Sequence, residues 1–257
     1  MQKYKTFSYL CIMKPGYIIL LILLSGLCHT AAAQSWLPDT VGCDCQVVRH
    51  EGYTLLYDES HEQARWVAYL LTKERLKGDV PRKGNDKFIP DTTVTSSSAL
   101  SSDYSHSGYS RGHLAPAADM KWSVRAMRES FLMSNISPQT SEFNDGIWQR
   151  AEKLVRRWAT EYDSLYVITG PVLEDGLPTI GHQNHISIPR CFYKVVYDPK
   201  RKKGIALIIE HENSPEPIQS FAVTIDEVES TTGIDFFPKM DNEEQIESTI
   251  NPKDWRW

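Results

Sequence analysis

One polar stretch constrains this chain of 257 residues more than any other, because two short blocks place several reactive side chains at fixed spacing. The first block, residues 110–119, reads SRGHLAPAAD; the second runs from Asn135 to Glu152 and includes Asn144. A neutral histidine can accept a proton from water near pH 7, an amide oxygen suits Mg²⁺, and an arginine can hold a phosphate through two donors. The pattern therefore indicates cleavage of a phosphodiester with the help of one hard cation.

These residues resemble the DNA/RNA non-specific endonuclease family, also called the ββα-metal nucleases. The family pattern reads Asp-Arg-Gly-His, then Ser-Asn-Ile/Val-x-Pro-Gln, then Leu-Asn-x-x-x-Trp and a Glu eight residues past that Asn. It is matched by Arg111, Gly112, His113, Ser134, Asn135, Pro138, Gln139, Asn144, Trp148 and Glu152. The family's Asp is replaced here by Ser110. Further similarity extends the resemblance over most of the chain, from about Tyr53 to Phe237.

The resemblance implies a role for each matched side chain. His113 would be the general base on the attacking water, and Asn144 would be the direct ligand of Mg²⁺, with Mn²⁺ able to substitute. Glu152 lies about 12 Å from Asn144 along a straight helix, so it would act through a water of the metal's shell. As an alternative, Glu152 is a solvated carboxylate that pairs with Arg156 four residues on.

Two arginines and a second asparagine complete the predicted site. Arg111 would support phosphate, and Asn135 would hold the geometry of the site. Arg82 stands where the family has a phosphate-clamping arginine, but a solvated surface arginine explains it equally well. The predicted substrates are DNA and RNA, cleaved with little sequence preference and leaving 5′-phosphate ends.

The substitution at Ser110 favours a second reading from another class of protein. Losing an acid from the motif could leave a catalytically weakened nuclease-fold protein that only binds nucleic acid. If the missing acid normally faces the imidazole, its loss should also leave His113 less basic than in the usual motif. The retention of His113, Asn144 and Glu152 favours an enzyme.

The remaining pattern predicts one α+β domain, with a mixed or antiparallel central sheet and a ββα unit on one side. Strands are predicted at residues 53–57, 165–169, 192–197, 205–209 and 221–224. Residues 61–76 are predicted to be a helix, since Trp66, Val67, Leu70 and Leu71 recur at helical spacing. In the ββα unit, the strands are predicted at 111–118 and 131–134 and the helix at 144–160, with Arg156 on its outward face. Ser123 is predicted to cap a short helix that ends at Glu129.

The N-terminal residues 1–33 read as an export signal, followed by an endonuclease domain over residues 34–257. Three lysines precede an apolar run at 17–24, and Ala31-Ala32-Ala33 provides small residues for cleavage. Met13 would serve equally well as the true start. The run is shorter than the roughly 20 residues that a span requires, so no stable membrane insertion is expected after cleavage. This predicts a secreted or periplasmic protein, while a lipoprotein anchored at Cys28 ranks lower because Leu27 precedes it.

Three cysteines remain after the leader: Cys43, Cys45 and Cys191. In an oxidising compartment we expect one disulfide from the N-terminal pair to Cys191, with one thiol left over. The formal charge of −5 becomes −8 when the three leader lysines are removed. Such an acidic total is compatible with a nuclease, because phosphate binding depends on local basic groups.

Overall fold

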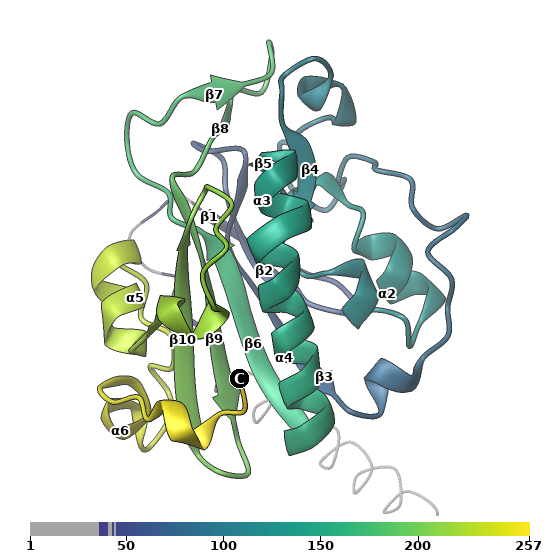
Figure 1. Ribbon diagram of the computed structural model, residues 1–257. Coiled ribbons are helices and arrows are strands. Elements are labelled where there is room, and N and C mark those ends of the chain that lie inside the picture. Colours follow the sequence, from purple (N-terminus) through teal and green to yellow (C-terminus); the bar gives the residue numbers. More distant parts are fainter. Residues whose placement is uncertain (1–35, 41–42, 44) are drawn as a thin grey trace, which may run out of the picture.

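A seven-stranded antiparallel sheet forms the centre of the computed structural model, which describes residues 36–40, 43 and 45–257 (Figure 1). The predicted export signal, with its alternative start at Met13, lies outside the described residues. Across the sheet the strands are β1 (Cys45–Arg49), β2 (Thr54–Asp58), β3 (Gln63–Thr72), β6 (Ser164–Pro171), β9 (Cys191–Asp198), β10 (Lys203–Glu210) and β11 (Ala222–Val223). All neighbouring pairs are antiparallel, which confirms the predicted fold class in its antiparallel form. No helix in the described part of the chain is long and apolar enough to cross a membrane.

The helix predicted over residues 61–76 is wrong, because this segment forms β3 in the middle of the sheet. Trp66 and Ala68 face one apolar cluster, while Val67, Tyr69 and Leu71 face the other. A strand that is buried on both faces reads as a continuous apolar run, and such a run mimics a buried helix in sequence. The segment is a strand and not a helix because it pairs with β2 on one side and β6 on the other.

Helices cover both faces of the sheet, so the molecule has three layers. On one face lies α4 (Gln149–Tyr162), which buries Leu154, Val155 and Trp158 against the sheet. The opposite face is covered by α5 (Ile225–Thr232), α6 (Glu243–Glu247) and the segment with Phe236 and Phe237 between them. Figure 1 shows α4 crossing the sheet in front and α5 and α6 stacked beyond β10.

The ββα unit is present with α4 as its helix, but both strands differ from the predicted bounds. The strand predicted at 111–118 ends at His113, and Ala117–Asp119 is a 3-10 turn. Strand β4 (Ser110–His113) pairs antiparallel with β5 (Ile136–Gln139). The strand predicted at 131–134 is wrong, because Met133–Asn135 is a 3-10 turn that leads into β5. Helix α3 (Ser141–Phe143), a π-helical turn (Asn144–Trp148) and α4 follow one another, with a kink at Gly146. The helix predicted at 144–160 is confirmed as α4, although its regular part begins later, at Gln149.

The remaining elements are short. Helix α2 (Val124–Glu129) begins after Ser123, whose hydroxyl accepts hydrogen bonds from two backbone amides, as predicted for an N-cap. A two-stranded ribbon of β7 (Thr179–Ile180) and β8 (Ile186–Ser187) lies at one end of the molecule. Irregular backbone dominates 92–109, with one 3-10 turn at Ser101–Tyr104. Further 3-10 turns are Arg75–Lys77, Ala117–Asp119, Ile218–Phe221 and Pro252–Asp254.

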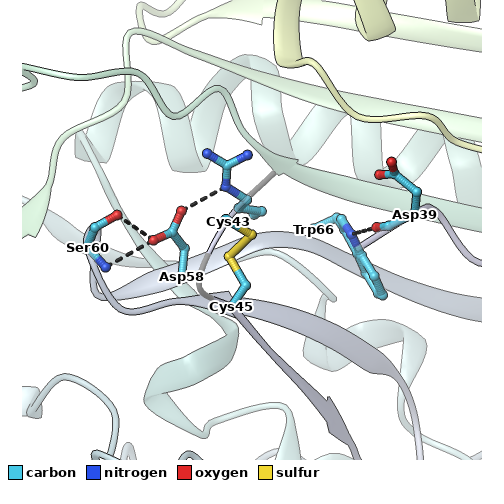
Figure 2. The surroundings of a disulfide bond; sticks show 7 residues. Asp39, Cys43, Cys45, Asp58, Ser60 and Trp66 are labelled. Carbon is cyan, nitrogen blue, oxygen red and sulfur yellow. Dashed lines mark hydrogen bonds and ion pairs between the residues drawn. A yellow bond between two sulfur atoms is a disulfide. The ribbon is translucent and has the colours of Figure 1, made fainter. Parts of the chain in front are cut away.

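The cysteine pairing differs from the prediction. Cys43 and Cys45 form a disulfide with each other, and Cys191 is a free, half-buried thiol in β9. Figure 2 shows this disulfide beside the carboxylate of Asp58, which accepts hydrogen bonds from Ser60 and from the Arg65 guanidinium. The bridge stays within one local turn at the sheet edge, whereas Cys191 lies across the sheet in β9.

Candidate active site

A cleft of about 340 Å³ lies within the ββα unit, between the end of β4 and the start of α4. Five of the six predicted site residues line it: Arg82, Arg111, His113, Asn144 and Glu152. Lys153 and Arg156 also line it, and Asp145 and Gln149 complete the polar wall on the helix side. Three arginines and a lysine therefore surround one histidine, two amides and two carboxylates, an arrangement suited to an anionic substrate.

His113 reaches the cleft from the end of β4, where alternation places Arg111 on the same face. Its imidazole packs edge-on against Phe131, with ring centroids 4.8 Å apart, and beside Phe88 at 5.6 Å. The Nε2 atom is buried and has no hydrogen-bond partner among the described residues. Burial, and secondarily the positive charge of Arg82, holds the pKa of His113 well below its usual range. The residue is half-exposed to the cleft, and its imidazole is neutral at pH 7 and able to accept a proton.

The glycine between these two residues has a packing reason. A Cβ atom on Gly112 would lie 2.2 Å from the side chain of Gln139, which is fully buried against it on β5. Only a residue without a side chain allows β4 and β5 to pair here. Gly112 therefore sets the position of the strand that carries His113.

Both predicted arginines are held in the cleft by aromatic rings. The Arg82 guanidinium lies 5.1 Å from the centroid of Phe131, the ring that also contacts His113. Arg111 donates a hydrogen bond of 2.6 Å to the carbonyl of Ser101 and lies over the ring of Tyr104 at 5.7 Å. Arg82 thus lines the cleft with the other predicted residues and is not a solvated surface arginine remote from the site.

Asn144 begins the π-helical turn that precedes α4. The turn is pinned by the segment after β10, because Asn213 Oδ1 accepts a hydrogen bond from the backbone amide of Ile147 at 3.0 Å. One residue earlier in the turn, Gly146 has non-helical φ and ψ of −98° and −111°. A Cβ there would lie 2.2 Å from Asn213 Oδ1. The position of Asn144 therefore depends on a close contact with a distant loop.

Asn135 is fully buried beneath the cleft and does not line it. Its Oδ1 accepts a hydrogen bond from the Ala115 amide at 2.9 Å, and its Nδ2 donates to the carbonyls of Ala115 and Ser130. These three bonds hold the chain that leaves His113 against the end of α2. This agrees with a supporting role in the geometry of the site.

Glu152 belongs to a charge network in which its pairing with Arg156, considered as the alternative reading, is present, but the carboxylate is 14% exposed and not solvated. The sequence did not reveal that Asp119 and Lys194 belong to the same network. Arg156, one turn further along α4, donates to Asp119 at 2.9 Å and lies 3.9 Å from Glu152. Asp119 also accepts a hydrogen bond from the Tyr69 hydroxyl at 2.8 Å. Arg156 therefore faces the cleft and its floor, contrary to the outward position predicted for it. The sequence feature that pointed to this contact was the spacing of four residues between Glu152 and Arg156, which places both side chains on one side of a helix.

A buried lysine from the sheet completes this network. Lys194 in β9 is 1% exposed, and its ammonium lies 4.0 Å from the centroid of the Trp148 ring and donates to Thr169 Oγ1. Burial raises the pKa of Glu152, and the charges of Lys194 and Arg156 oppose that rise. Burial likewise lowers the pKa of Lys194, and the negative charge of Glu152 opposes this decrease. The sheet thus supplies positive charge beneath a carboxylate that burial alone would neutralise.

Ser110 does not contact His113. It shares with Gly112 the face of β4 that points away from His113, and its hydroxyl is 2.9 Å from that of Ser141. Two other acids near this part of the chain are engaged elsewhere, since Asp119 binds Arg156 and Asp103 accepts a hydrogen bond from the Leu100 amide. The expectation that residue 110 faces the imidazole is therefore wrong.

The donor set fits a hard divalent cation. Asn144 offers an amide oxygen from a half-exposed position in the cleft, and its Nδ2 donates to Asp145 at 3.3 Å. Glu152 adds a carboxylate whose nearest ion-pair partner is the 3.9 Å contact with Arg156. Few protein oxygens and room for water are what Mg²⁺ prefers.

An antiparallel sheet with a ββα unit and this cleft defines a nuclease-type scaffold. A family model described as DNA/RNA non-specific endonuclease matches residues 39–243, so the chain belongs to that family. It is 33% identical to mouse mitochondrial nuclease EXOG over 216 residues, covering 77% of this chain and 58% of that relative. It is 34% identical to human mitochondrial endonuclease G, covering 76% of this chain and 70% of that relative.

A solved structure agrees with these similarities. A chain from the crystal structure of the EndoG/EndoGI complex superposes with a TM-score of 0.70 at 30% identity. The match covers 76% of this chain and 87% of the other. The central antiparallel sheet and the ββα unit are thus an EndoG-like fold.

Proposed function

We propose that this protein is an extracytoplasmic, Mg²⁺-dependent endonuclease that hydrolyses phosphodiester bonds of DNA and RNA with little sequence preference. The observation that carries this proposal is the neutral imidazole of His113 with an unpartnered Nε2, placed in one cleft with Arg82, Arg111 and Asn144. Family membership supports the same reaction class.

In this proposal His113 is the general base. Its imidazole accepts a proton from the attacking water, and the low pKa keeps the ring unprotonated before the reaction. The edge-on contact with Phe131 restrains the ring at the cleft wall. A low pKa also limits the strength of the base, so the imidazole must lie close to the water that it deprotonates.

The cationic side chains bind and orient the phosphate. Arg82 and Arg111 lie on the His113 side of the cleft and Arg156 on the helix side. A phosphate between them would accept charge-assisted hydrogen bonds from both sides. Contacts to phosphate carry no sequence information by themselves, which supports cleavage with little sequence preference.

Asn144 would hold Mg²⁺ directly, and Glu152 would accept hydrogen bonds from water in the same part of the cleft. The bound ion would supply positive charge that stabilises the phosphate and the departing 3′ oxygen. Lys194 beneath Glu152 favours the carboxylate form that such a role requires.

The proposed location rests on the leader pattern of residues 1–33 and on the disulfide between Cys43 and Cys45. A disulfide persists in an oxidising compartment. After leader removal the protein would carry no membrane span and act as a secreted or periplasmic enzyme.

The decisive experiment incubates the purified protein with supercoiled plasmid and with a long RNA, each with Mg²⁺ and with EDTA. Nicked plasmid and shortened RNA are expected only with Mg²⁺. His113→Ala should reduce the rate at least 10²–10⁴-fold, the usual contribution of a general base, while retaining DNA binding. Tight binding without any cleavage by the wild-type protein would favour the alternative, a weakened nuclease-fold protein that binds nucleic acid.

A further inference from the structure

Five carboxylates converge on the face of the sheet that lies away from the cleft. Asp226 and Glu229 come from α5, Asp235 from the segment after it, and Glu243 and Glu247 from α6. Figure 1 shows α5 and α6 next to one another at the side of the molecule opposite α2. The cluster therefore shares no residue with the catalytic cleft.

The acids form two groups that meet at one residue. In the first, carboxylate oxygens of Asp226, Glu229 and Glu247 all lie within 4.8 Å of one another. In the second, the same limit holds for Asp235, Glu243 and Glu247. Glu247 is thus the one residue that belongs to both groups.

Glu247 is the observation that separates this cluster from an ordinary acidic surface. The residue is 4% exposed, and its Oε1 is buried with no hydrogen-bond partner among the described residues. Asp235 Oδ1 is buried and unpartnered in the same way. A buried carboxylate without a donor carries a large desolvation cost, so such groups are ordinarily paired or bound to a metal.

Protein cations do not balance this charge. Within residues 45–257, none of the five carboxylates forms an ion pair with a lysine, arginine or histidine. The one hydrogen bond that the group accepts from the neighbouring backbone runs from the Phe236 amide to Glu229 Oε1, at 2.8 Å. Glu247 therefore lacks the basic partner that Asp119 has in Arg156.

We propose that these five residues form a Ca²⁺ site, centred on Glu247, that fastens α6 to α5. Ca²⁺ takes six to eight oxygens at about 2.3–2.6 Å, so ligands on opposite sides of the ion lie roughly 5 Å apart. Within each group the carboxylate oxygens lie no more than 4.8 Å apart, which is compatible with that geometry. Mg²⁺ usually binds one or two carboxylates and retains water, and Zn²⁺ prefers nitrogen and sulfur. A site made wholly of carboxylates favours Ca²⁺.

The site would stabilise the layer that covers the sheet. One apolar cluster buries a side chain from each of the three segments: Val228 from α5, Phe236 from the segment between the helices, and Ile246 from α6. An ion that bridges α5, the following segment and α6 would hold these three side chains together. Without the ion, repulsion among the carboxylates would oppose that packing.

The test uses the full-length mature protein after removal of metals with a chelator. Calcium binding is measured by isothermal titration calorimetry, and thermal unfolding is followed with and without CaCl₂. Glu247→Gln and Glu243→Gln probe the site, and Glu244→Gln is the matched control, since Glu244 is an exposed neighbour in the same helix. An Asn144→Ala background removes the proposed metal ligand of the catalytic cleft.

In the Asn144→Ala background we expect one Ca²⁺ to bind and, at a hundredfold excess over Kd, to raise Tm by about 5–10 °C. Glu244→Gln should retain this response, whereas Glu247→Gln and Glu243→Gln should lose it. If Glu247→Gln does not fold, Glu243→Gln alone decides the outcome. Absence of Ca²⁺ binding at millimolar concentration, or a full Tm response in Glu243→Gln, would overturn the proposal.

Discussion

Ser110 and His113 stand three residues apart on the same strand, yet their side chains point to opposite faces. A two-residue period is strict in a strand, so neighbours in a motif need not be neighbours in the site. Arg111 shares the face of His113, and Ser110 instead meets Ser141 at the start of the helix. Residue 110 therefore acts on the helix rather than on the imidazole.

Replacing Ser110 with Asp should consequently leave the acidic limb of the kcat/KM–pH profile unchanged. The new carboxylate would lie beside Ser141 and outside the cleft, too far to favour imidazolium. Arg82→Gln is the contrasting variant, because the Arg82 charge lowers the pKa of His113 and its loss should move that limb upward. An upward shift in Ser110→Asp equal to that of Arg82→Gln would show that residue 110 does tune the base.

Asn144 and Glu152 should respond differently to substitution, because only Asn144 is proposed as a direct ligand. Asn144→Ala should raise the Mg²⁺ concentration for half-maximal activity, or abolish activity. Glu152→Gln should have the smaller effect on this concentration. Metal titrations at fixed pH measure both variants, and a larger shift for Glu152→Gln would reverse the assignment.

At the scale of elements, the π-helical turn Asn144–Trp148 depends on the segment after β10. His211 accepts a hydrogen bond from the Thr140 amide at 2.9 Å, and its Nδ1 donates to the Pro189 carbonyl. Asn213 then holds the amide of Ile147. A loop some 70 residues downstream in sequence thus holds both the N-cap of α3, at Thr140, and the turn that presents Asn144, at Ile147.

Gly146→Ala should therefore impair catalysis although Gly146 carries no reactive group. The added Cβ would lie 2.2 Å from Asn213 Oδ1 and would displace either the turn or the loop. We expect a loss of stability of about 1–3 kcal/mol, typical of overpacking, and a rate loss on the order of 10²-fold from misplacing Asn144. Denaturant unfolding and nicking rates provide the measurements, with exposed Glu142→Ala as the control. Wild-type rates in Gly146→Ala would contradict this account of the turn.

At the scale of the whole molecule, Asp91 joins three distant segments. Its carboxylate accepts hydrogen bonds from His50 at 2.8 Å and from Ser134 at 2.5 Å, and also from the hydroxyl of Thr93. Burial by itself raises the pKa, but these hydrogen bonds outweigh it and lower the pKa of Asp91 to about 2. The turn after β1 is thereby tied to the chain that carries Asn135.

This depressed pKa predicts a specific acid sensitivity. The stabilising contribution of Asp91 is present in full above its unfolded pKa near 4 and is lost as pH falls toward 2. Its size at neutral pH is about 2 kcal/mol, from a shift of roughly two pKa units. Denaturant unfolding of wild type and Asp91→Asn at pH 6 and at pH 2.5 measures it. The difference between the two proteins should shrink at the lower pH, and an equal difference at both would refute the linkage.

The sequence by itself determined the features that depend on nearby residues. Asn144 and Glu152 were placed on one helix because the apolar period of 148–158 is local, and α2 was placed by the cap at Ser123. Arg111, His113, Asn144 and Glu152 meet in one cleft because the motif fixes both their chemistry and their spacing, whereas Arg82 joins them from a separate loop.

The tertiary structure decided whatever depends on a partner far away in sequence. Strand β3 is a strand because β2 and β6 pair with it, and its burial on both faces removes the alternation that would have revealed it. Cys43 pairs with Cys45, two residues away, whereas Cys191 lies in β9, several strands across the sheet from β1. The charges of Arg156, Asp119 and Lys194 meet beneath Glu152 only when α4 packs on the sheet. Local patterns specify which elements form, but long-range packing specifies which faces meet, and the environment of each catalytic group depends on those faces.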